Sequence, residues 1–174
     1  MPKRPSLILV PFALAIAACV GTPDIAATQP SVAAAPTFDV LRFFEGRLEG
    51  QGRLATIFSA TVPVEVDSVG RRNGDTLHLV QTIRQGDKPA RTRAWIIHQV
   101  SPNRYAGTLT DAEGQIRGEV DGNRLHLTFT MKGGLPVEQW LTLSPDGRRA
   151  YNLLTVRKFG IPVARLAEDI RKLG

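Results

Sequence analysis

Histidines, nucleophilic serines and glycine-rich loops carry much of the metal, acyl-transfer and phosphate chemistry of proteins, and this chain of 174 residues shows none of their usual motifs. Its three histidines, His78, His98 and His126, lie far apart, and none has a carboxylate at metal-ligand spacing. We expect them to be solvated or paired across strands. Neither a Gly-x-Ser-x-Gly elbow nor a phosphate-binding loop occurs. The sequence therefore predicts no metal, no cofactor and no catalysis.

The single cysteine, Cys19, stands at the end of a distinct N-terminal segment. Two basic residues precede an apolar run from Leu7 to Ala18, which is too short to be a permanent membrane-spanning helix. The sequence Ile16-Ala17-Ala18-Cys19 resembles the lipobox of bacterial lipoproteins, in which the cysteine thiol receives a diacylglyceryl group, a peptidase cuts before it and the new amino terminus is acylated. This resemblance implies a signal peptide over residues 1–18 and attachment to a membrane through acyl chains on Cys19.

The resemblance to lipoproteins also implies a compartment. Val20 stands where, in the enteric sorting rule, an aspartate would retain a lipoprotein in the inner membrane, so we expect the periplasmic face of the outer membrane. Loss of Lys3 and Arg4 with the signal would lower the net charge from +6 to +4. Because this excess is small and spread along the chain, we expect no nucleic-acid partner. Acylation would use the only thiol and exclude a disulfide.

The rest of the chain divides into a linker and one domain. Residues 20–37 are mostly Ala, Pro, Thr, Ser and Gly without apolar periodicity. This composition predicts a disordered tether over 19–37, running from the acylated cysteine. A single domain over 38–174 is large enough to bury its own core.

The elements that would position any functional side chain are predicted to be strands. Apolar and polar residues alternate in five segments, which is typical of strands with one buried face: 62–67, 77–83, 115–120, 124–131 and 137–143. Tight-turn pairs such as Asn73-Gly74 separate them, and the short connections predict antiparallel neighbours. Closure into an up-and-down barrel of about 8–10 strands would remove open edges. The glycines of Gly46–Gly52 (GRLEGQG) would permit a bend or bulge.

Two short helices are predicted beside the barrel. Residues 38–45 (FDVLRFFE) have apolar residues at helical spacing, with Thr37 or Asp39 as a cap. Residues 161–173 (IPVARLAEDIRKL) repeat apolar residues every third or fourth position, with a proline near the start. A meander barrel followed by a helix is the lipocalin-like plan.

Several short motifs are spread over this domain: Phe38-Asp39, Phe43-Phe44-Glu45-Gly46, Gly107-Thr108, Gln139-Trp140-Leu141, Asn152 and Lys158-Phe159-Gly160. Together they resemble a family of bacterial lipoproteins called domain of unknown function 3833 (DUF3833). The resemblance implies a lipocalin-like fold and a lipoprotein signal, and it brings no activity. This chain has Gln139 where the resemblance leads us to expect an acidic residue, so no role for that carboxylate carries over.

A closed barrel can enclose one small ligand, and four residues are candidates for contacting it. Trp95 and Trp140 could wall a pocket or be ordinary aromatics. Trp140 should lie on the strand face opposite Leu141, exposed or covered by the C-terminal helix. Asn152 could orient a head group, although we favour a role in tying down a loop backbone. Lys158 could neutralise an acidic head group at the barrel mouth or be a surface lysine.

These observations lead to three functional hypotheses. The first is a lipid-anchored barrel that binds an apolar or amphipathic envelope molecule, such as a small lipid-like ligand, without catalysis. The second is a structural module whose outer face docks on an envelope protein of unknown identity. The third is an enzyme acting on envelope lipids, with the histidines as acid–base groups.

Overall fold

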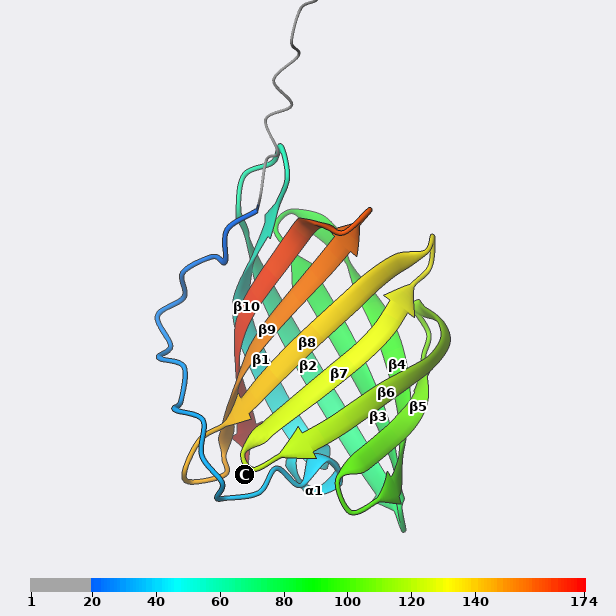
Figure 1. The fold of residues 1–174 in the computed structure, drawn as a ribbon. Helices are drawn as coiled ribbons and strands as arrows, with labels where there is room; N and C mark the ends of the chain where they lie inside the picture. The colour runs from blue at the N-terminus through cyan, green and yellow to red at the C-terminus, as the bar shows by residue number, and fades with distance from the viewer. Residues whose placement is uncertain (1–19) are drawn as a thin grey trace, which may run out of the picture.

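The computed structural model describes residues 20–174, and within them ten strands form one closed antiparallel barrel (Figure 1). Each strand pairs with its neighbours in sequence, and β10 closes the barrel against β1. The strands are β1 (Gly46–Thr56), β2 (Val62–Asn73), β3 (Thr76–Gln85), β4 (Lys88–Ser101), β5 (Arg104–Leu109), β6 (Ala112–Asp121), β7 (Arg124–Met131), β8 (Leu135–Leu143), β9 (Arg149–Lys158) and β10 (Ile161–Leu173). The predicted all-β antiparallel barrel is confirmed, and it is consistent with a lipocalin-like plan.

The period-two alternation of the sequence sets which side chains face inward. In β7, for example, Leu125, Leu127 and Phe129 are buried, and the residues between them lie on the outer face. The turns carry the expected chemistry, since Gly74 and Gly122 both adopt positive φ angles between paired strands. The apolar faces of the strands therefore meet in one interior.

The prediction of a C-terminal helix is wrong. Residues 161–173 form β10, which pairs with β9 on one side and with β1 on the other. The inward face of β10 carries Glu168 between Leu166 and Ile170, and this glutamate interrupts the apolar alternation that would have marked a strand. Pairing of β10 also covers two strand edges that would otherwise remain open.

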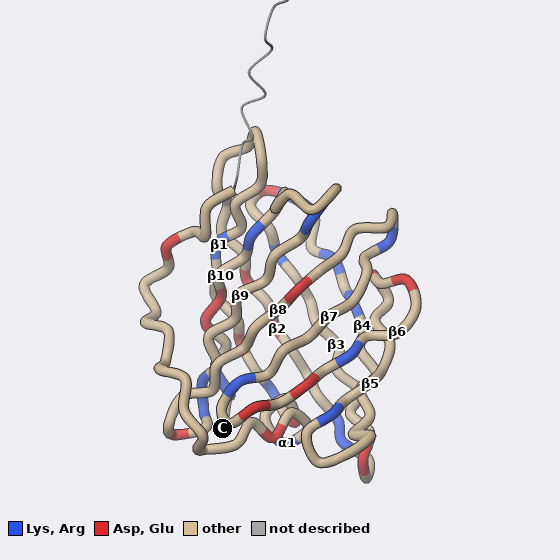
Figure 2. The backbone as a smooth tube through the Cα atoms, in the orientation of Figure 1, with Lys and Arg blue, Asp and Glu red and all other residues tan. Residues whose placement is uncertain are grey.

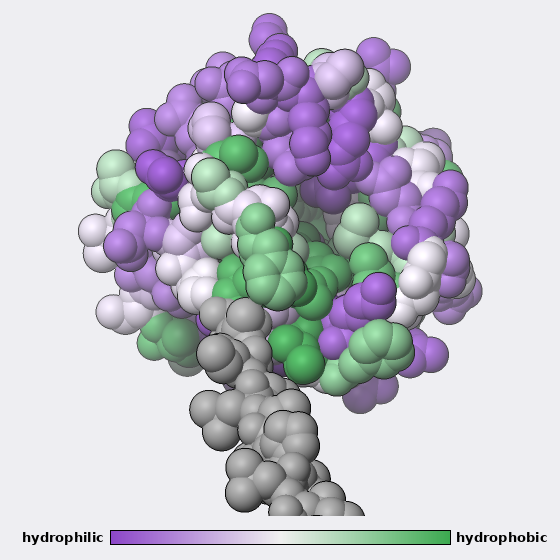
Figure 3. All heavy atoms as spheres, turned by 90° about the horizontal axis from the view of Figure 1, so that it is seen from above, coloured by the Kyte–Doolittle hydropathy of each residue, from purple (hydrophilic) through white to green (hydrophobic). Residues whose placement is uncertain are grey.

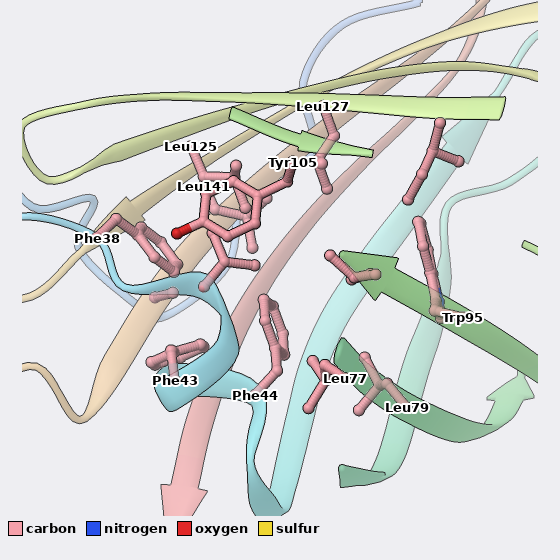
Figure 4. Packing of buried hydrophobic residues seen from close by; sticks show 14 of the residues in the cluster. Phe38, Phe43, Phe44, Leu77, Leu79, Trp95, Tyr105, Leu125, Leu127 and Leu141 are labelled. Atoms are coloured by element: carbon pink, nitrogen blue, oxygen red, sulfur yellow. The ribbon is translucent and has the colours of Figure 1, made fainter. Parts of the chain in front are cut away.

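A short helix and the residue before it close one end of the barrel. The helix α1 (Val40–Phe44) begins at Asp39, whose side chain accepts a hydrogen bond from the Arg42 amide at 3.0 Å, as an N-cap should. The buried residues of this closed end are Phe38, Val40, Leu41, Phe43 and Phe44. Figure 4 shows Phe38, Phe43 and Phe44 directed toward the strands, where they pack near Tyr105 and Leu77. The predicted N-terminal helix is confirmed.

The opposite end of the barrel is not covered by an element of its own. It is formed by the connections at residues 57–61, 86–87, 110–111, 132–134 and 159–160, and we call it the open end. Leu54, Leu154 and Leu166 occupy inward positions near this end yet remain partly exposed. Figure 3, which looks down on this end, shows apolar residues near the centre beside a hollow and a mainly hydrophilic periphery.

Residues 20–37, for which the sequence predicts a tether, contain no helix or strand. They run along the outside of the barrel from the open end toward the closed end (Figure 1). The Asn123 side chain donates a hydrogen bond to the Ser31 carbonyl at 3.0 Å and accepts one from the Ala33 amide at 2.8 Å. The predicted signal peptide and Cys19 lie outside the described residues. No helix between residues 20 and 174 has the length and apolar character needed to cross a membrane.

Candidate functional site

A group of polar side chains lies inside the barrel, and Gln81 of β3 is at its centre. The Gln81 Oε1 atom accepts hydrogen bonds from the Trp95 indole Nε1 at 2.7 Å and from Arg93 Nε at 2.8 Å, both on β4. Gln81 Nε2 donates to the Ser68 hydroxyl at 3.1 Å. One amide thereby fixes a ring and a guanidinium from the neighbouring strand. We call the set Ser68, Gln81, Arg93, Trp95, Gln139, Asn152 and Glu168 the interior polar network.

The second part of the network is a buried carboxyl group on the closing strand. Glu168 is 5% exposed, and its Oε2 accepts a hydrogen bond from Asn152 Nδ2 at 2.8 Å. The side chain projects over β1 at Gly50 and Gly52, and a Cβ atom on Gly50 would overlap Glu168 Oε1. β1 pairs with β10 and β2 without a register shift, so these glycines make room for the carboxyl group and do not form a bulge.

Burial controls the charges in this network. Burial raises the pKa of Glu168, and the hydrogen bond from Asn152 and the positive charge of Arg93 partly oppose the increase. Burial lowers the pKa of Arg93 to about 10, partly opposed by Glu168. Arg93 therefore remains a cation at neutral pH. Since a buried charge needs a partner, each of these two groups favours the ionised form of the other.

Two buried acceptor atoms of the network have no hydrogen-bond partner among the described residues, namely Gln139 Oε1 and Asn152 Oδ1. An unpaired buried acceptor costs about 1–3 kcal/mol, so such atoms usually face water or a ligand. Gln139 lines an internal cavity of about 30 Å³ together with Gln81, Arg93 and Glu168. A cavity of this size holds a water or two, or a small polar group.

Apolar walls lie between this cavity and the open end. Val64, Val66 and Ile83 form a cluster, with Leu54 and Leu166 packed against it, that is separate from the main core. The facing wall belongs to the main core and includes the apolar side chains Phe129, Val137 and Val156. Arg93 is the one charged network residue that stays partly exposed among the described residues. The interior thus combines an apolar entrance with a polar floor.

A family model with the description "Protein of unknown function (DUF3833)" matches residues 14–172. The chain belongs to this family. The DUF3833 chain is also similar to a solved structure, the crystal structure of Rv2717c from M. tuberculosis, with a TM-score of 0.62 and 16% sequence identity. The similarity covers 80% of this chain and 99% of that chain, and at this identity it shows the fold alone. Comparison with the curated proteins found no match.

The DUF3833 barrel brings two of the four predicted ligand residues inside. Trp95 is part of the interior polar network, and it also packs edge-on against Phe129 at 5.6 Å between ring centroids. Asn152 faces the interior as expected, but our favoured interpretation is wrong, because its amide donates to the Glu168 carboxyl group and not to a loop backbone. The reason is that the C-terminal strand, expected as a helix, places Glu168 directly opposite Asn152.

The other two predicted residues lie outside the cavity. Trp140 is on the outer face, as its position relative to Leu141 predicted, and no helix covers it. Its ring stacks on His126 at 3.9 Å between centroids, and the Arg124 guanidinium lies 4.1 Å from its centre. Lys158 is exposed at the end of β9, next to the open end.

Sequence reasoning missed five network residues, Ser68, Gln81, Arg93, Gln139 and Glu168. Two of them left a readable signal, because Gln81 and Gln139 occupy inward positions between apolar residues of otherwise regular strands. Glu168 could not be identified in the same way, since its segment had been interpreted as a helix. A polar residue in the apolar register of a predicted strand is the pattern to look for.

The histidines are distributed over the outer face of the described barrel. His78 and His98 are exposed, and His98 Nδ1 lies 2.8 Å from the Thr76 hydroxyl. His126 Nε2 contacts Glu138 Oε1 at 3.1 Å. Between residues 20 and 174, no group of three or more histidine, cysteine or acidic side chains is arranged to hold a metal ion.

Proposed function

We propose that this DUF3833 protein binds an apolar or amphipathic molecule of the cell envelope inside its barrel, without catalysing a reaction. The observation that supports this function best is the interior polar network beneath an apolar entrance. Lipid-like molecules have the same two-part character, with an apolar chain and a polar end. Burial of the ligand's apolar chain would supply affinity, and hydrogen bonds to the interior polar network would supply specificity.

The network indicates which polar end would fit. Gln139 Oε1 and Asn152 Oδ1 need hydrogen-bond donors, whereas Arg93 is itself a donor. A hydroxyl or amide group can satisfy both kinds of partner, because it donates and accepts. The cavity of about 30 Å³ has room for a small polar group only, so just the polar end of the ligand would enter it.

Native mass spectrometry of the protein purified from a bacterial envelope fraction tests this proposal. The expected result is a reproducible added mass that disappears after extraction with organic solvent. Arg93→Leu should lose the added mass, whereas Arg117→Leu, which removes an exposed arginine on the outer face of β6, should retain it. A clean unliganded mass, under conditions that preserve a known lipid carrier, would contradict ligand binding.

The proposal includes attachment of the protein to the periplasmic face of the outer membrane through acyl chains on Cys19. It is supported by the lipobox-like residues before the cysteine and by the start of the described chain near the open end (Figure 1). The test is incorporation of labelled palmitate. Cys19→Ala should abolish the label, because it removes the thiol that receives the diacylglyceryl group, and should leave the signal segment uncleaved.

Docking on an envelope protein remains the second candidate, because one feature of the outer face favours it. Arg124, His126 and Trp140 form a continuous stack on β7 and β8, and tryptophan and arginine are enriched at interface hot spots. Cross-linking in intact cells would test this candidate. A specific adduct that is lost in Trp140→Ala but kept in Trp95→Phe would favour docking over ligand transport.

A further inference from the structure

Two phenylalanines are almost fully exposed, and both lie at the open end. Phe58, in the loop between β1 and β2, is 91% exposed, and Phe159, in the turn between β9 and β10, is 93% exposed. β1 and β10 are paired strands, and the Ile57 amide donates to the Val163 carbonyl at 3.0 Å. The two loops are therefore neighbours on one rim. A single exposed apolar residue is ordinary, but two aromatic tips on one rim indicate a contact surface.

The backbone at these two positions is unfavourable for phenylalanine. Phe58 has φ 61° and Phe159 has φ 50°, both in the left-handed region that asparagine and glycine adopt more readily. The hairpin turn at the closed end between β2 and β3 has Gly74 at such a position instead, with φ 57°. Folding alone would therefore favour asparagine or glycine at Phe58 and Phe159. We therefore infer that the two phenylalanine rings contact a partner outside the protein.

The place where the described chain begins suggests which partner this is. The segment that begins the described chain starts near the open end (Figure 1), where Thr22 accepts a hydrogen bond from Arg165 of β10 at 3.1 Å. The apolar run of residues 7–18 and Cys19 are joined to the barrel at this point. Lys132 and Lys158 also lie at connections of this end, and Figure 2 shows basic positions at its turn tips. Aromatic and basic side chains together suit a membrane interface with anionic lipids.

We propose that the open end docks on the surface of a lipid bilayer, with Phe58 and Phe159 inserted at the level of the head groups. The β1–β2 loop and the β9–β10 turn then act as two anchors beside the barrel entrance. This surface is separate from the interior polar network. The inference therefore holds whether or not the barrel contains a ligand, and it concerns orientation on the membrane rather than attachment.

Depth-dependent quenching of tryptophan fluorescence tests the proposal on the full-length protein. Phe58, Phe159 and Val100 are each replaced by tryptophan in a Trp140→Phe background. Val100 is the matched control, because it is 61% exposed and lies at the closed end of β4. Each protein is reconstituted in vesicles of phosphatidylethanolamine and phosphatidylglycerol that contain nitroxide-labelled lipid.

The expected result is at least about twofold stronger quenching by a shallow label for F58W and F159W than for V100W, because interfacial tryptophans sit among head groups. Equal quenching of the three proteins would overturn the proposal. A blue shift of F58W or F159W without vesicles, growing with protein concentration, would also overturn it and assign the rim to contact between copies.

A second pair of variants excludes a purely structural role for the rings. The double variant F58N/F159N should unfold at the same temperature as the parent or higher, because asparagine tolerates positive φ. A lower unfolding temperature would show that the rings stabilise the barrel itself, and this would contradict their assignment as membrane contacts.

Discussion

Asn152 and Glu168 face each other across the β9–β10 pair, and the Asn152 amide donates to the Glu168 carboxyl group over 2.8 Å inside the barrel. This contact holds an ionisable group where water is scarce. Of the opposing influences on Glu168, burial is the largest, so the neutral carboxyl form is favoured relative to an exposed glutamate. Protonation of Glu168 is therefore linked to the stability of the fold.

The first prediction concerns the pH dependence of stability. The pKa of folded Glu168 lies above its ordinary value of 4.5, so the folded state binds this proton more tightly than the unfolded state. The contribution of Glu168 is fully present below pH 4.5 and is lost as the pH rises through the folded pKa. Urea unfolding of the parent and of Glu168→Gln between pH 4 and 8 checks this prediction. The glutamine variant should gain stability relative to the parent as the pH rises.

The control for this prediction is Glu49→Gln on the exposed face of β1, which should show no such trend. A difference between the parent and Glu168→Gln that stays constant over the pH range would mean that Glu168 ionises in the folded barrel as it does in water.

The second prediction concerns the space that β1 leaves for the closing strand. A Cβ atom on Gly52 would overlap the Ala167 carbonyl oxygen, which belongs to the backbone and cannot rotate away. Gly52→Ala should therefore destabilise the protein by about 1–3 kcal/mol, as overpacking does elsewhere. Thermal unfolding provides the measurement. Gln51→Ala, on the exposed face next to it, should be close to neutral, and comparable losses in the two variants would rule out the steric explanation.

The third prediction uses the two tryptophans as separate reporters. Trp95 is buried and donates to Gln81, whereas Trp140 is partly exposed on the outer face. In Trp140→Phe, the fluorescence emission of the remaining Trp95 should be blue-shifted and resistant to quenching by acrylamide. Trp95→Phe should retain a red-shifted, quenchable emission and lose about 0.5–1.5 kcal/mol of stability with the hydrogen bond. Identical spectra for the two variants would place both rings in the same environment.

The fourth prediction concerns the segment before α1. The buried Asn123 side chain also donates to the Leu143 carbonyl at 2.9 Å, so one residue fastens both the Ser31–Ala33 stretch and the end of β8. Asn123→Ala should cost about 1–3 kcal/mol and make residues 20–33 accessible to limited proteolysis. Asn103→Ala, at an exposed turn, is the control. Unchanged cleavage kinetics in Asn123→Ala would show that other contacts hold the segment.

The sequence was sufficient to predict the barrel because most strands have one apolar and one polar face. The same rule placed Trp140 outside and Asn152 inside. The alternation failed to predict β10. Two inward positions of this strand carry the charged residues Glu168 and Lys172, so the remaining apolar residues recur at intervals that resemble those of a helix. The interior polar network depends on that strand and on side chains from five others, so no local sequence pattern contained the hydrogen-bond partner of Asn152.

The pairing of β1 with β10 has a consequence for how the molecule acquires its shape. Nine of the ten strand pairs join neighbours along the chain, but the closing pair joins β1 to β10, from Arg47 opposite Leu173, and cannot form before β10 is present. Until that strand is in place, β1 and β9 each present a bare edge, and the loop to be closed spans almost the whole domain. Strand β10 must therefore be synthesised before the barrel can close, and loss of its residues should leave an open, aggregation-prone sheet.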